Sequence, residues 1–450
     1  MRILFFILII IFAGADQVWA GVFAETGHGN QMTGVLQDAA FPRGSCRQCH
    51  VDGTARYPKG LWRENDNDLC FTCHSMDTFS GLYPGRETYE VSSHIDPRFV
   101  WPGPFPPAHR ELDMAGKCIN CHDPHGKKDR FGVIPSMMIA REDILCLSCH
   151  DGDPSVKDIS REIRKPYSHR VGSDGHTAFE GNNPDRYSYV GGNRHVACSD
   201  CHNAHAVSGD FMRPVAPEAS QRNLRVSRIR VQNSGPGVIP RYEYLPASDT
   251  STPVLEYEIC YKCHSSWTQQ PPGQQDIAKL LNTNNASFHP VEGQGKNFGI
   301  DPNSFVDSTM NSFSTIYCSD CHGSEDPDNR GPHGSQFSNI LKGPYETQSN
   351  SRPSTREDLC FICHSFETYA DSFSALFQQE ASRFNKHVSH VGQQNIPCFA
   401  CHASHGSPQF GALIVTGRNP GLRSFSMTTN GGSCMPTCHD SRSYTVTYPR

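Results

Sequence analysis

Apolar residues are sparse in this 450-residue chain, and the most continuous apolar run stands at its start. Residues 3–15 form this run, which follows a single arginine and precedes the small-residue segment "VWA". This order is typical of a secretory signal peptide, and the run is short for a membrane-spanning helix. We therefore expect a signal peptide at 1–20 and an exported chain without an integral membrane segment, in the periplasm or at the outer cell surface.

One later segment, 365–390, has a helical apolar period. Its apolar side chains recur mainly at spacings of three and four residues, at Phe366, Ala370, Phe373, Phe377 and Phe384. This spacing predicts an amphipathic helix across the segment.

Strand signals gather in the middle of the chain. Apolar and polar residues alternate in "NLRVSRIRV" at 223–231 and in "VLEYEI" at 254–259, which predicts a small β-hairpin. The proline-rich "WPGPFPPAH" and the polar "QQPPGQQ" predict extended linkers. Regular secondary structure should therefore be sparse.

The composition provides too little apolar surface for an ordinary core. Hydrophobic residues make up 36% of the chain, beside 38 glycines and 32 prolines. A chain of this length normally buries more apolar surface, so it is either disordered or filled by something other than side chains.

The cysteines indicate what fills it. Nine copies of C-x-x-C-H use eighteen of the twenty cysteines, Cys46, Cys49, Cys70, Cys73, Cys118, Cys121, Cys146, Cys149, Cys198, Cys201, Cys260, Cys263, Cys318, Cys321, Cys360, Cys363, Cys398 and Cys401. This motif is typical of c-type haem attachment, in which two thiols bond to the porphyrin and the adjacent imidazole binds the iron. Zinc sites vary in the position of their other ligands, and a disulfide framework would not attach a histidine to every pair.

The last two cysteines have a different spacing. Cys434 and Cys438 are separated by three residues, and His439 follows directly. A zinc site and a redox-active cysteine pair are the alternatives. The order of thiol, thiol and histidine is kept, so we favour a tenth covalently attached haem c.

The histidines suffice for two iron ligands at each haem. Ten lie in the motifs: His50, His74, His122, His150, His202, His264, His322, His364, His402 and His439. Eight others recur in phase with the motifs, four ahead of a first motif and four behind one: His94, His169, His289, His390, His125, His205, His333 and His405. The other two distal ligands must come from His28, His109, His176, His195 and His387, and His28 and His109 are our first choices because they lie near the first unit, which lacks a downstream histidine.

The pattern His…C-x-x-C-H-x-x-His-Gly…C-x-x-C-H resembles the doubled-motif multihaem c-type cytochromes of metal-respiring bacteria, a family in which longer attachment loops also occur. The resemblance implies a haem-cored, mostly irregular fold with short α-helices and a few β-hairpins. We divide the chain into two-haem units at 21–90, 91–165, 166–284 (with a β-rich insertion at 206–257), 285–376 and 377–450.

The expected function is electron transfer without catalysis, toward extracellular acceptors as the resemblance implies. The formal charge of −6 would fall to about −16 with ten oxidised haems. Nucleic acid is therefore excluded as a partner, and redox proteins or an outer-membrane porin–cytochrome complex are expected. Arginines at 222, 225, 228 and 230 are either a docking face for an acidic redox partner or a solvated face. A nitrite, hydroxylamine or tetrathionate reductase with one open haem is the alternative, as is a subunit of an extracellular cytochrome filament.

Overall fold

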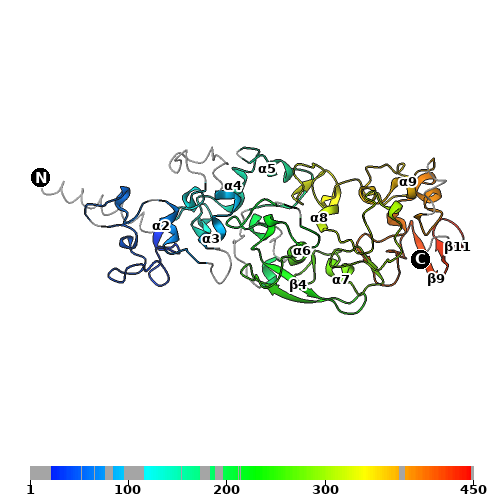
Figure 1. Ribbon diagram of the computed structural model, residues 1–450, viewed down its shortest axis with the longest axis horizontal. Helices are drawn as coiled ribbons and strands as arrows, with labels where there is room; N and C mark the ends of the chain where they lie inside the picture. Colours follow the sequence, from blue (N-terminus) through cyan, green and yellow to red (C-terminus); the bar gives the residue numbers. More distant parts are fainter. Residues whose placement is uncertain are drawn as a thin grey trace.

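The computed structural model describes residues 22–446 except 52, 65, 77–84, 96–115, 154, 173–182, 188–195, 211, 213 and 374–380. The molecule is elongated, and the chain runs along its long axis from α2 near the amino-terminal end to β9 and β11 at the other (Figure 1). The predicted signal peptide, His109, His176, His195 and the linker "WPGPFPPAH" lie outside the described residues. None of the described helices is long and apolar enough to cross a membrane.

The helices are few and short within the described ranges, as the sparse apolar periodicity predicts. They are α2 (Asn67–Phe71), α3 (Arg86–Tyr89), α4 (Glu142–Leu147), α5 (Ile159–Glu162), α6 (Glu256–His264), α7 (Ile277–Leu281), α8 (Cys318–Cys321) and α9 (Phe366–Tyr369). Asp66, Asp158 and Asp276 cap α2, α5 and α7 by accepting hydrogen bonds from backbone N–H groups of the first turn. The mostly irregular fold class predicted from the sequence is confirmed.

The strands form only small antiparallel sheets. They are β1 (Lys128–Asp129) with β2 (Gly132–Val133), β3 (Tyr167–Ser168) with β7 (Gly334–Ser335), β4 (Arg228–Gln232) with β5 (Arg241–Leu245), β6 (Ser287–Phe288) with β8 (Gly406–Ser407), and β9 (Leu422–Thr428), β10 (Gly431–Pro436) and β11 (Arg442–Thr445) in one sheet. The β3–β7 and β6–β8 ladders join segments more than a hundred residues apart, so they connect successive parts of the long molecule.

Glycines make these two long-range ladders possible. A Cβ atom on Gly334 would lie 1.9 Å from the Glu162 carbonyl oxygen, and one on Gly406 would lie 1.8 Å from that of Leu280. Any larger residue would therefore push the two strands away from the neighbouring backbone. This explains the glycine that follows histidine in "HGS" at both places.

The insertion packs with the helices that follow it around an ordinary protein core. Ile229, Tyr261 and Leu281 are almost completely buried in one cluster that β4, α6 and α7 form. Beside it, the fully buried Arg228 guanidinium donates a hydrogen bond of 3.1 Å to the Glu258 carboxylate.

Two secondary-structure predictions were wrong. The segment 254–259 is not a strand, because most of it belongs to α6, and the partner of β4 is β5. The helix across 365–390 ends at Tyr369, since the Asp371 carboxylate accepts a hydrogen bond of 2.8 Å from the Phe373 N–H in a turn. Of the predicted stripe, Ala370 is buried and Phe366 packs beside it, whereas Phe373 is 97% exposed. Phe377 lies outside the described residues.

The arginine stripe is divided between the interior and the surface. Arg228 is buried against Glu258 and is therefore withdrawn from any docking face. Arg222 and Arg230 lie at the surface, where they pair with Asp210 at 2.7 Å and with Glu243 at 3.3 Å.

Candidate functional site: ten attachment motifs along one cavity

One continuous cavity of about 4090 Å³ runs through the molecule, and side chains of all ten cysteine–histidine motifs line it. A tenth of this volume, on the order of 400 Å³ for each motif, lies in the range of about 300–1,000 Å³ found for single ligand sites. The space thus suits a row of ligands of porphyrin size, whose apolar rings would supply the core that the few apolar side chains do not.

Consecutive motifs are neighbours along the whole cavity. At four junctions the first cysteine of the adjacent motif, together with burial, raises the pKa of a first cysteine, in the pairs Cys70–Cys118, Cys146–Cys198, Cys260–Cys318 and Cys360–Cys398. At the other five, burial raises a thiol pKa and a thiol of the adjacent motif raises it further, in the pairs Cys49–Cys73, Cys121–Cys149, Cys201–Cys263, Cys321–Cys363 and Cys401–Cys434. The motifs therefore follow one another in an unbroken chain.

Every motif histidine faces a second imidazole ring. The ring centroids are 5.9–6.5 Å apart in the ten pairs His50–His125, His74–His28, His122–His205, His150–His94, His202–His333, His264–His169, His322–His405, His364–His289, His402–His387 and His439–His390. Two metal–nitrogen bonds of about 2 Å each, with half an imidazole on either side, give a separation of about 6 Å. The ring pairs therefore fit an iron held between two histidines.

The pairs follow one rule. The histidine of a second motif faces the histidine that lies upstream in the same unit, as His264 faces His169. The histidine of a first motif faces the downstream histidine of the following unit, as His202 faces His333. The first unit therefore has no shortage of ligands, because His50 faces His125 and His74 faces His28. The last unit departs from the rule, because its first-motif histidine, His402, faces His387 of the same unit.

Backbone carbonyls orient the first-motif histidines. The Nδ1 atoms of His50, His122, His202, His322 and His402 lie 2.8–3.0 Å from the carbonyl oxygens of Lys59, Ser136, Arg222, Asn339 and Ala412. Since a carbonyl can only accept, Nδ1 carries the proton and the Nε2 lone pair is free for a metal. Lys59, Ser136, Asn339 and Ala412 have φ between 52° and 61°, a left-handed turn that presents these carbonyls.

The two distal histidines that face the motif histidines of one unit come from successive units, and a hydrogen bond connects them. The Nδ1 of an upstream histidine donates to the carbonyl of the residue just before the downstream histidine of the next unit, at 2.7 Å for His94–Ala204, 2.6 Å for His169–Pro332 and 2.5 Å for His289–Ser404. His28 makes the same bond to Pro124. The ladders β3–β7 and β6–β8 hold two of these contacts in register.

Burial keeps six of the paired rings neutral at pH 7. It lowers the imidazole pKa to about 4 for His150, His264, His364 and His405, and to about 3 for His333 and His387. Nearby imidazoles lower each of these pKa values further. A metal binds the neutral imidazole, so these rings are prepared as ligands at pH 7.

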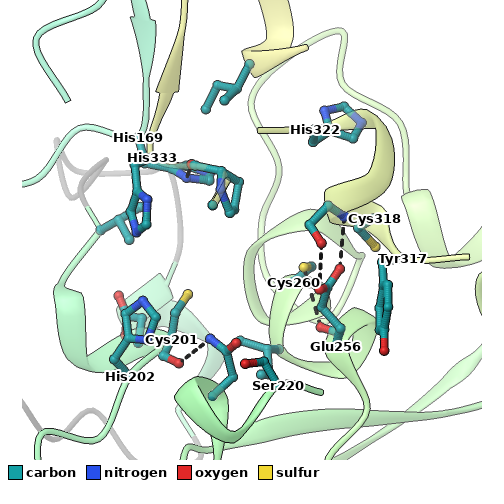
Figure 2. A pocket seen from close by; sticks show the side chains of 18 of the residues that line it. His169, Cys201, His202, Ser220, Glu256, Cys260, Tyr317, Cys318, His322 and His333 are labelled. Atoms are coloured by element: carbon teal, nitrogen blue, oxygen red, sulfur yellow. Dashed lines mark hydrogen bonds between the residues drawn. The ribbon is translucent and has the colours of Figure 1, made fainter. Parts of the chain in front are cut away.

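Carboxylates join successive units beside the cysteines. Glu256, at the start of α6, accepts hydrogen bonds of 2.9 Å and 2.8 Å from the backbone N–H and the hydroxyl of Ser319 (Figure 2). Glu142, at the start of α4, binds Ser199 in the same way. Each glutamate stands four residues before one attachment motif and fixes the next motif, so it holds two adjacent sites at a set spacing. Sequence reasoning missed these two glutamates, although both stand four residues before the first cysteine of a motif.

The tenth motif is built on a different element. Cys434 lies in the middle of β10, paired with Phe425 of β9 and Arg442 of β11, whereas the first cysteines of the other motifs lie in short helices or 3₁₀ turns. His439 nevertheless faces His390 with ring centroids 6.2 Å apart, as at the other sites. None of the twenty cysteines, all within the described residues, is in a disulfide.

A family model for the doubled CXXCH motif matches the chain at residues 39–78 and 113–154. These segments contain the first four attachment motifs. No curated protein and no solved structure matches the chain. The matched motifs indicate covalently bound haem c, and the chain is similar to the multihaem c-type cytochromes with doubled CXXCH motifs, which transfer electrons.

Proposed function

We propose that this chain is an exported decahaem cytochrome that conducts electrons along its length toward an acceptor outside the cell. The observation that carries the proposal is that all ten motif histidines face a second imidazole. When bound, haem supplies an iron that exchanges single electrons. The chain's own residues hold that iron from both sides, orient the rings through backbone carbonyls and keep neighbouring sites close.

We also propose the five two-haem units defined by the motif spacing, with ten covalent haems in total. The unbroken sequence of adjacent motifs supports conduction from one end to the other. A pair of imidazoles leaves no exchangeable axial position on an iron, which supports a conduit over a reductase.

Intact mass spectrometry and electron paramagnetic resonance (EPR) of the purified, oxidised protein test the proposal together. We expect the mass of ten haems and only low-spin ferric signals. Fewer than ten haems would contradict the count. A substantial high-spin signal, or carbon monoxide binding after reduction, would contradict paired histidine ligation and favour an enzyme with an open site.

A further inference from the structure

The last unit poses a problem for the ligation rule. Each earlier first-motif histidine faces a histidine of the following unit, but His402 does not. Its ring instead faces His387, which lies ahead of the motif in the same unit. We propose that His387 is the distal iron ligand of the haem attached to Cys398 and Cys401.

The surroundings of His387 repeat those of the downstream histidines. His390 Nδ1 donates a hydrogen bond of 2.8 Å to the carbonyl of Lys386, the residue just before His387. Upstream histidines of the other units bond in the same way to the residue before a downstream histidine. His387 thus occupies the equivalent place although it comes from a different part of the unit.

Ring orientation gives the same assignment. The interplanar angles at the other four first motifs are 20°, 11°, 24° and 2°, and the angle between His387 and His402 is 28°. At the five second motifs the angles are 33°, 74°, 54°, 49° and 44°. His387 therefore belongs with the near-parallel pairs of the first motifs.

Local contacts fix the proton on His387. The Ser382 hydroxyl donates its hydrogen to the Phe384 carbonyl at 3.0 Å and lies 2.6 Å from His387 Nδ1. Since that hydroxyl has one hydrogen, it accepts from Nδ1–H, and the Nε2 lone pair is left for the iron. Tyr369 and Phe384 make edge contacts with the His387 ring at 5.1 Å and 5.2 Å and hold its plane.

This inference rests on the proposed haem content, and the variants His387→Ala and His109→Ala test it. We expect both proteins to keep the wild-type haem mass. His387→Ala should show one high-spin haem in ten and bind one equivalent of carbon monoxide after reduction, while His109→Ala should stay fully low-spin. A fully low-spin His387→Ala protein would overturn the inference, whereas a wild-type haem mass below ten would overturn the proposed function instead.

His387→Met covers the case in which the alanine variant does not fold. Methionine is itself an axial ligand of haem iron. We expect the absorption of one methionine-ligated haem to appear in the oxidised protein. A spectrum identical to that of the wild type would contradict the assignment of His387.

Discussion

The imidazole rings of His322 and His405 lie almost parallel, with an interplanar angle of 2° and centroids 6.1 Å apart, although 82 residues separate them in sequence. In the proposed division of the chain, His322 belongs to the fourth two-haem unit and His405 to the fifth. One unit therefore supplies a ring for the site of the unit before it, so the units are not independent modules.

Replacing His405 by alanine should affect the fourth unit more than its own. We expect ten covalent haems, of which one, attached through Cys318 and Cys321, becomes high-spin. Without the His405 ring, the iron of that haem would keep His322 as its one imidazole ligand. EPR and carbon monoxide titration measure the change. The haem at Cys398 and Cys401 should keep its low-spin signal, and its loss instead would contradict the cross-unit rule.

The ring angles predict two groups of low-spin haem. The five first-motif pairs are within 28° of parallel, while the second-motif pairs are rotated by 33° to 74°. Because the relative orientation of two axial imidazoles affects the g-values of ferric iron, EPR of the oxidised protein should resolve two groups of five. A single uniform signal for all ten haems would contradict this expectation.

The double variant Cys434→Ala and Cys438→Ala should lose one haem. The thiols of the tenth motif are the only covalent anchors that its three-residue loop offers. Intact mass spectrometry should show nine haems against ten in the wild type. An unchanged mass would mean that this motif carries no covalent haem.

Gly406→Ala should destabilise the protein and disturb the two sites beside β6 and β8, those of His289 and His405. The added methyl group would lie 1.8 Å from the carbonyl oxygen of Leu280 in α7, so β8 and α7 must move apart. Overpacking of this kind costs about 1–3 kcal/mol of unfolding free energy. Denaturant unfolding measures the loss. Gly209→Ala is the matched control, since nothing lies within 4 Å of its added Cβ, and equal stability of the two variants would refute the steric argument.

Arg228→Ala should be among the most damaging single changes in the insertion. Arg228 is fully buried, and its loss leaves the Glu258 carboxylate unpaired, which costs about 3–5 kcal/mol. Arg230 pairs with the half-exposed Glu243, so Arg230→Ala should cost about 0–1 kcal/mol. Denaturation curves of the two variants compare them directly. A similar loss in both would contradict the assigned roles.

The attachment chemistry was predictable from sequence because it is local. Two thiols and an imidazole lie within five or six consecutive residues, so the motif is complete before the chain folds. The sparse secondary structure was also predictable, since too few apolar residues recur at a helical period. The prediction of a helix across 365–390 was wrong. The apolar period did not account for the turn in which the Asp371 carboxylate accepts a hydrogen bond from the Phe373 N–H.

The partner of each motif histidine could not be read from the chain, because it depends on contacts over long separations. His202 faces His333, which is 131 residues later, since the β3–β7 ladder and the bond from His169 to Pro332 bring that segment back. His387 looked like a spare histidine, and only the folded chain shows that its ring lies opposite that of His402. Spacing along the sequence identifies possible ligands, but packing between units selects among them, because an imidazole can bind an iron only where the folded backbone places it about 6 Å from its partner ring.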